Sequence, residues 1–169
     1  MPADTLYEDD IVAWAQQQAQ AIRELARSRP ELSNTIDWEN IAEEVDEVGQ
    51  APVKQVASLL RQFMLHLAKA LSDVGSSSLN RWRAETAVFQ ADARDRFTAS
   101  MRGKLDVDKL WCEALRAAAP SLADHGAAIA ADLTTASPLT LDELISSDLD
   151  LDRAVSIVET RLGRVMEQR

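Results

Sequence analysis

The sequence predicts an all-α protein, an antiparallel bundle of about four long helices with additional shorter helices towards the C-terminus. Apolar residues recur at spacings of three and four almost from end to end, which is the period of an α-helix. The five prolines and five glycines fall mostly between these periodic runs, where they separate helices. The sequence shows no convincing strand pattern.

The 169 residues are predicted to form a single helical domain, since this length is typical of one domain with its own core. A core bundle is expected over about residues 5–133. The C-terminal helices, about 140–167, are expected to pack on it.

The first helix is expected to begin near Asp4 or Thr5 and to end before Pro30. Trp14 is expected to lie in the core. The predicted inward face consists of Tyr7, Ile11, Trp14, Gln18, Ile22 and Leu25.

The second helix has clear end signals. Asp37 is a plausible N-cap, and Ile36 and Ile41 have the spacing of a hydrophobic staple. Gly49 suits the left-handed position that ends many helices, so a helix break is expected there. The predicted buried stripe consists of Trp38, Ile41, Val45 and Val48.

Three further long segments have helical periodicity. A helix from about Pro52 to Val74 is followed by one from about Leu79 to Phe97. Another, from about Val107 to Ala118, is expected to stop at Pro120, and the alanine-rich segment to about Leu133 is expected to be helical.

Two short helices are expected near the C-terminus. Thr140 and Glu143 have the spacing of a capping box, and Asp150 can cap a last helix.

Composition narrows the functional classes. The net charge of -10 opposes long-range attraction to nucleic acid or to an anionic membrane. Nucleic-acid binding is an alternative that requires one basic face, made of Arg81, Arg83, Arg94 and Arg102. Cys112 is the single cysteine, and no apolar stretch resembles a signal peptide or a membrane span, so a cytoplasmic protein is expected.

Common catalytic motifs are missing from the sequence. It has no glycine-rich phosphate loop, no G-x-S-x-G, no H-E-x-x-H and no EF-hand loop, so no cofactor is predicted.

Glu44 and His66 are the candidate catalytic residues. Each lies about 80° from the centre of the apolar stripe of its predicted helix, at the margin of the core. From there an imidazole could meet a carboxylate or a metal ion.

A metal site is a weaker hypothesis. Glu44 and His66 with a third carboxylate, Glu85 or Asp92, form a candidate ligand set, but Phe63 occupies the position where a Glu-x-x-His motif needs its glutamate.

We favour a structural interpretation of these polar residues. A cluster of Glu44, His66, Lys69 and Arg96 would fix the register of neighbouring helices through salt bridges and hydrogen bonds.

The sequence resembles a bacterial family known as domain of unknown function family 29, over about residues 6–148. The resemblance implies an all-helical fold and no assigned activity. Two departures are Ala70, where the family often has an aromatic residue, and Ser137-Pro138-Leu139-Thr140 in place of Cys-Pro-Tyr-Thr, which makes a thiol-based role at that point improbable. The resemblance to the family rests on Tyr7, Asp10, Trp14, Asp37, Asn40, Glu43, Glu44, Gly49, His66, Leu67, Ala68, Lys69, Trp82, and Ser137 to Leu144.

Two functional hypotheses follow. The first is a non-enzymatic helical module that binds a protein partner or forms a homo-oligomer, and it predicts an exposed apolar patch. The alternative is a metal-dependent or acid/base enzyme that uses Glu44 and His66, and it requires the two side chains to converge.

Overall fold

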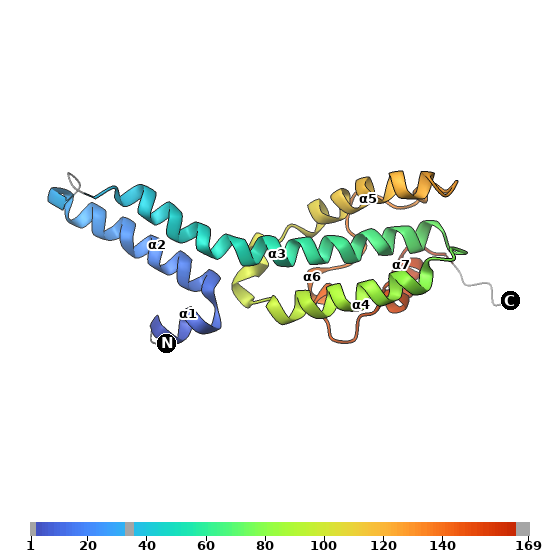
Figure 1. The fold of residues 1–169 in the computed structure, drawn as a ribbon, viewed down its shortest axis with the longest axis horizontal. Helices are drawn as coiled ribbons and strands as arrows, with labels where there is room; N and C mark the ends of the chain where they lie inside the picture. The colour runs from blue at the N-terminus through green and yellow to red at the C-terminus, as the bar shows by residue number, and fades with distance from the viewer. Residues whose placement is uncertain (1–2, 33–35, 165–169) are drawn as a thin grey trace. The chain divides into compact units, whose positions relative to one another are not determined.

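The computed structural model describes residues 3–32 and 36–164, and within these ranges it contains helices and no strand (Figure 1). The all-α prediction is therefore confirmed. The long helices are α2 (Ile11–Ser28), α3 (Trp38–Ser72), α4 (Leu79–Arg96) and α5 (Val107–Ala123). The shorter ones are α1 (Ala3–Asp9), α6 (Leu141–Leu144), α7 (Leu151–Arg161) and two 3-10 helices, η1 (Pro30–Leu32) and η2 (Ala99–Lys104).

The chain divides into two compact units. The first, called here the N-terminal unit, comprises residues 1–55 and 98–105, and the second, the C-terminal unit, comprises residues 56–97 and 106–169. Helix α3 contributes residues to both. The expectation of one domain with its C-terminal helices packed on it stays a prediction.

The first predicted helix is divided at Asp10. The Asp10 carboxylate accepts a hydrogen bond from the backbone N–H of Ala13 at 3.0 Å and so caps α2. The buried residues of α2 are Val12, Ala15 and Ala19, whereas Tyr7 and Leu25 are exposed. Trp14 is half-buried and packs edge-on against Tyr7, so the predicted inward face was wrong by about one residue.

Helix α3 is continuous where the sequence predicted two helices. Asp37 does cap it, because its carboxylate accepts from the backbone N–H of Asn40 at 3.3 Å. Gly49, however, does not have the left-handed backbone that ends a helix, and both it and Pro52 lie inside α3. Gly49 is buried against α2, so its lack of a side chain serves close packing.

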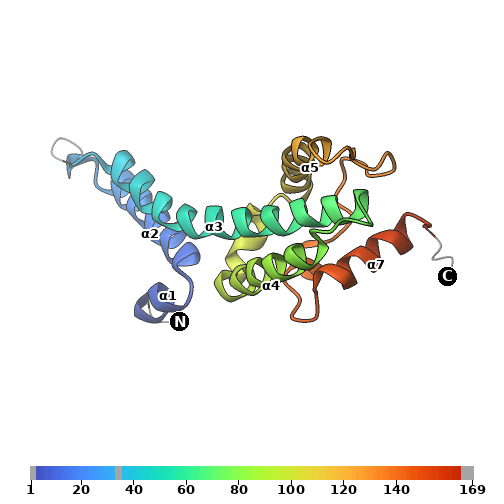
Figure 2. The same cartoon turned by 45° about the vertical axis from the view of Figure 1, so that its right-hand side comes forward.

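The C-terminal unit has the more substantial core. Phe63, Leu67 and Trp111 are almost fully buried, as their helical periodicity predicted. In both ribbon views α4 and α7 lie side by side, and Arg83 of α4 binds Asp152 of α7 with oxygens at 2.9 and 3.0 Å (Figures 1 and 2). The residues of α3 buried in this unit are Val56, Leu60, Phe63, Met64, His66, Leu67, Ala68, Ala70 and Leu71.

The segment after α5 is the main difference in this unit. The alanine-rich residues 124–133 form turns and loop and no helix, so that prediction was wrong. The backbone of Gly126 has a φ of 73°, which ends the helical path. Trp111 Nε1 donates to the Thr134 carbonyl at 2.9 Å, which ties the following loop to α5.

The two predicted late helices are present. Thr140 and Glu143 form a complete capping box at α6, and the Asp150 carboxylate accepts from the Arg153 N–H at 2.7 Å at the start of α7. Helix α7 ends at Arg161, and the predicted extension to residue 167 lies partly outside the described residues. None of the described helices is long and apolar enough to span a membrane.

Candidate functional site

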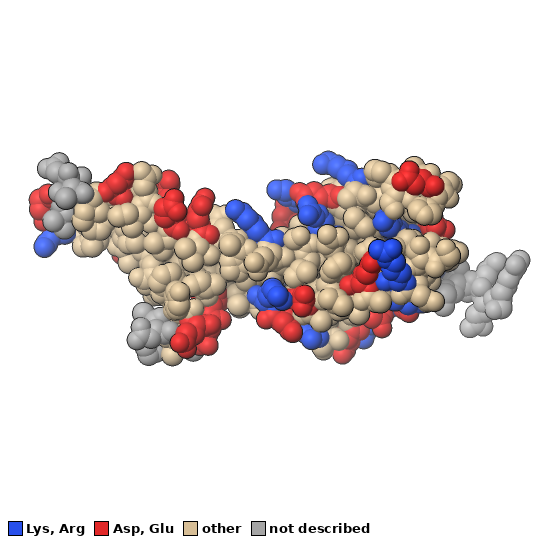
Figure 3. All heavy atoms as spheres, in the orientation of Figure 1, with Lys and Arg blue, Asp and Glu red and all other residues tan. Residues whose placement is uncertain are grey.

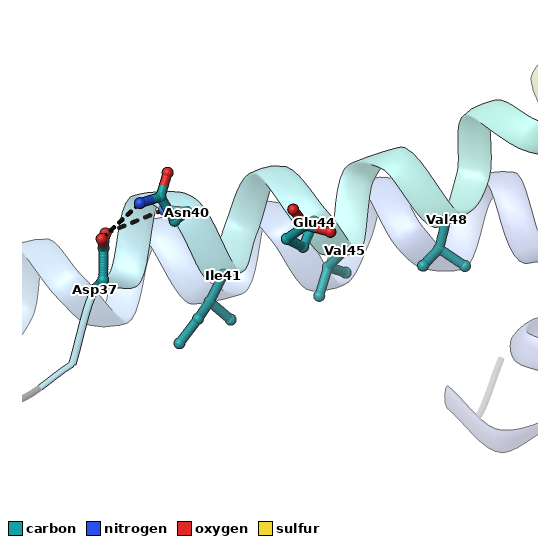
Figure 4. Close-up of a pocket in the computed structure, with 6 residues that line it drawn as sticks. All are labelled: Asp37, Asn40, Ile41, Glu44, Val45 and Val48. Carbon is teal, nitrogen blue, oxygen red and sulfur yellow. Dashed lines mark hydrogen bonds between the residues drawn. The ribbon is translucent and has the colours of Figure 1, made fainter.

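An open groove of about 410 Å³ runs along the first part of α3, in the N-terminal unit. Its floor is apolar, since Ile41, Val45 and Val48 point into it from one side of the helix (Figure 4). Ile41 is 42% exposed and Val48 is 48% exposed. The groove is lined by Asp37, Asn40, Ile41, Glu44, Val45 and Val48.

The sequence predicted this stripe to be buried, and for Ile41 and Val48 that prediction was wrong. The buried positions of this part of α3 are Ala42 and Gly49. A Cβ atom on Gly49 would lie 3.0 Å from the Ala15 Cβ and 3.3 Å from the Val12 Cα. Helices α2 and α3 thus pack through small residues at close range, and this packing leaves the larger apolar side chains on the outer face.

Glu44 lies on the rim of this groove and is exposed. His66 belongs to the C-terminal unit, 22 residues further along the chain. The hypothesis that Glu44 and His66 converge on one site stays a prediction. The helix break expected at Gly49 is not found, because α3 continues through this residue.

His66 is buried in the C-terminal unit beside Glu85 of α4. Its Nε2 atom lies 3.2 Å from the Glu85 Oε2, and the other oxygen of Glu85 accepts from the Arg81 Nε at 2.8 Å. The imidazole stacks on Phe89 with an interplanar angle of 9°. The Nδ1 atom of His66 is buried and has no hydrogen-bond partner among the described residues.

Burial lowers the pKa of His66 below its usual 6.5, because the charged imidazolium loses water, while the Glu85 carboxylate opposes the shift. Lys69 adds to the lowering. The pKa of Lys69 is itself lowered by burial, and its ammonium lies 5.9 Å from the centre of the Trp82 ring. A neutral His66 with its proton on Nε2 fits the contact with Glu85.

The predicted polar cluster is therefore present only in part. His66 and Lys69 gather with Glu85, but Glu44 lies in the other unit and is absent from the cluster. Arg96 lies at the end of α4 and pairs with Asp92 of its own helix at 3.5 Å. The contact between α3 and α4 at this point joins His66 and Glu85, and Arg96 takes no part in it.

The proposed ligand set combines Glu44 of the N-terminal unit with His66 and Glu85 of the C-terminal unit. No group of three or more His, Cys, Asp or Glu side chains among residues 3–32 and 36–164 is placed to hold a metal ion. The hypotheses of a metal-dependent or an acid/base enzyme that uses Glu44 and His66 stay predictions.

Three of the four arginines of the nucleic-acid alternative form ion pairs with carboxylates. Arg81 pairs with Glu85, Arg83 with Asp152, and Arg94 with Asp95. On the face shown in Figure 3, basic and acidic groups alternate along this part of the chain.

Sequence reasoning missed a polar network at the start of α2. The Asp10 carboxylate accepts from the hydroxyls of Ser100 at 2.7 Å and Thr98 at 3.1 Å, as well as from Ala13. Burial raises the pKa of Asp10, but these hydrogen bonds outweigh it and lower the pKa below 3.8. The position of Asp10 just before an apolar run was a usable capping signal, whereas its partners 88 and 90 residues away carried none.

Comparison with known proteins places the chain in a family. The family model described as Domain of unknown function DUF29 matches residues 6–149. The chain belongs to this family. The crystal structure of an alpha-helical protein of unknown function from Rhodospirillum rubrum is similar to this chain, with 33% sequence identity and a TM-score of 0.76. The match covers 89% of this chain and 95% of that one. No curated protein matches the chain.

These similarities confirm the family resemblance and the helical fold. They assign no activity.

Proposed function

We propose that this protein is a non-enzymatic interaction module and that the groove on α3 is its binding surface. The observation that carries the proposal is the exposure of Ile41 and Val48 in one continuous apolar groove. Large apolar side chains that stay exposed together on one helix face are typical of protein-binding sites.

The distribution of exposed apolar residues supports this choice. Tyr7, Leu25, Ile41 and Val48, four of the six exposed large apolar side chains of the described chain, belong to the N-terminal unit. Among the buried residues of α2 and of the first part of α3, Ala15, Ala19, Ala42 and Gly49 are small, and Ile41 and Val48 stay uncovered. Burying a Val or Ile side chain in a complex contributes about 1.5–3 kcal/mol, so two or three of them can support specific binding.

The spacing within the groove indicates the mode of binding. Ile41, Val45 and Val48 follow one another at intervals of four and three, which is the pattern of a helix that packs against another helix. A helical segment laid along the groove would meet all three.

Site-specific photo-crosslinking tests the proposal. A benzoylphenylalanine at Val48 should crosslink to one discrete species in the producing cell, whereas the same residue at Val88, an apolar position of α4 that is 58% exposed, should not. Mass spectrometry identifies the crosslinked protein, and binding of the purified protein is then measured.

Sedimentation of the purified protein tests self-association in parallel. The double variant Ile41→Gln with Val48→Gln should abolish the binding of the crosslinked partner or the self-association, depending on which of them is found. The thermal unfolding of this variant should match that of the natural protein. The proposal fails if neither a crosslinked partner nor an oligomer depends on Ile41 and Val48.

A further inference from the structure

We infer that the occupant of the α3 groove is a basic amphipathic helix of a partner protein. This inference rests on the proposed function and names the chemistry of the partner. Its basis is the unequal charge of the two edges of the groove.

One edge of the apolar stripe is closed by packing. Ala42, which lies about 100° round the helix from Ile41, is fully buried, and Gly49 is buried against α2. A partner can therefore extend its polar contacts only past the opposite edge.

That opposite edge is acidic. Glu44 lies about 60° round the helix from Ile41, in the direction away from Ala42, and Asp37 and Glu47 follow on the same side. Asp37 and Glu44 line the groove directly, and in Figure 4 Glu44 lies above the row of apolar side chains.

No basic residue of α3 offsets this charge near the groove. From Trp38 to Val53 the helix contains Glu39, Glu43, Glu44, Asp46 and Glu47 and no Lys or Arg. Of these, Glu39 pairs with Arg23 of α2 at 3.1 Å. Neither Glu44 nor Glu47 forms an ion pair with a Lys or Arg of the described chain. On the face shown in Figure 3, acidic groups lie over the first part of α3, beside a broad surface without charge.

Charge complementarity selects among the occupants. Carboxylates along one rim attract a partner with Lys or Arg beside its apolar stripe and repel an acidic one. A second copy paired antiparallel through this stripe fits poorly, because the two-fold axis then brings the acidic rims of both subunits to the same side of the contact. The favoured occupant is a helix with apolar residues at intervals of three and four and with basic residues on one flank.

Three synthetic helical peptides provide the probes. The Lys peptide has 18 residues, with leucines at intervals of three and four and lysines on one flank of the stripe. The Glu peptide has glutamates in place of these lysines. The scrambled peptide has the composition of the Lys peptide without its periodicity, and it controls for attraction to the net charge of the protein.

Fluorescence anisotropy measures the affinity of each peptide for the full chain. The Lys peptide should bind at least tenfold more tightly than the Glu and scrambled peptides. The double variant Ile41→Gln with Val48→Gln should weaken the binding of the Lys peptide by about tenfold or more, because each substitution removes apolar contact at the centre of the interface.

A matched pair of charge reversals locates the attraction. Glu44→Lys should weaken the binding of the Lys peptide by about fivefold, since one contact at the rim becomes repulsive. The same variant should strengthen the binding of the Glu peptide. Glu43→Lys changes the net charge equally, but Glu43 is exposed on the far side of α3 and should change either affinity by less than about twofold.

The outcomes separate this inference from the proposed function. If both charged peptides bind equally well and Ile41→Gln with Val48→Gln abolishes both, the groove binds helices but the basic partner is refuted. If sedimentation shows a dimer that the same double variant abolishes, and no peptide preference exists, a second copy is the occupant and the inference also fails. If no peptide binding and no self-association depends on Ile41 and Val48, the inference and the proposed function both fall.

Discussion

Gly49 offers a sharp test of the packing in the N-terminal unit. In a helix exposed to water, Gly→Ala stabilises by about 1 kcal/mol, because alanine has the higher helix propensity. Here the added Cβ would lie 3.0 Å from the Ala15 Cβ, 3.3 Å from the Val12 Cα and 3.4 Å from the Val12 carbonyl oxygen. Two carbon atoms in favourable contact are about 3.5–4.0 Å apart.

The expected result is a net loss of stability. Neither the Ala15 methyl group nor the Val12 backbone can rotate away, so α2 and α3 must separate by several tenths of an ångström. Overpacking of this kind costs about 1–3 kcal/mol, which equals or exceeds the gain in helix propensity. We expect Gly49→Ala to lower the free energy of unfolding by about 1 kcal/mol and Gly49→Leu to lower it by at least about 2 kcal/mol.

Urea unfolding followed by circular dichroism measures both variants. Gly103→Ala is the control, because a Cβ on Gly103 meets no atom within 4 Å. Ala15→Gly should partly rescue Gly49→Ala, with a coupling of about 1 kcal/mol in the double-mutant cycle, since it removes the nearest obstructing atom. If Gly49→Ala raised the stability by the full propensity gain, the close contact between α2 and α3 would be refuted.

Three further predictions concern the C-terminal unit. Glu143→Gln should lower the free energy of unfolding by about 1 kcal/mol at pH 7, because Arg161 donates to both oxygens of this partly exposed carboxylate. The Arg161 hydrogen bonds lower the pKa of Glu143 from 4.5 to about 2. The stabilisation by this pair is therefore complete above pH 4.5 and is lost as the pH falls towards 2. In urea unfolding across this range, the free energies of unfolding of the variant and of the natural protein should converge as the pH falls. His66 should titrate below 6.5 in NMR spectra, because burial disfavours the imidazolium. Its contribution to the free energy of unfolding should be present above pH 6.5 and should decline as the pH falls below it. A pKa of His66 that is higher in the native protein than in the urea-unfolded chain would contradict this. Trp111→Ala should cost about 3–5 kcal/mol in urea unfolding, because the fully buried indole leaves a cavity and the Thr134 carbonyl loses its donor; a cost below about 1 kcal/mol would contradict the packing.

Local signals in the sequence identified the ends of several helices correctly. Asp37, Asp150 and the Thr140/Glu143 pair cap helices where they were expected to, because capping uses atoms only three residues apart. Helical periodicity likewise identified the buried face of α3 in the C-terminal unit, where large apolar residues face a large core.

The candidate site could not be predicted in the same way. Glu44 and His66 were each identified as boundary residues by their position on a helical wheel, but the sequence did not show whether the helix of Glu44 ends at Gly49. A glycine after an acidic helix can end that helix or permit another helix to approach. Only the contact with Ala15 distinguishes the two, and it lies 34 residues away in the chain.

The sequence by itself determined that this protein is helical, where most of its helices begin, and that it belongs with a known helical family. The tertiary structure decided which face of each helix is buried in the N-terminal unit. There, small residues pack α2 against α3, so Ile41 and Val48 remain at the surface. The physical reason is that periodicity defines an apolar face, while its burial depends on which partner surface comes close enough to cover it.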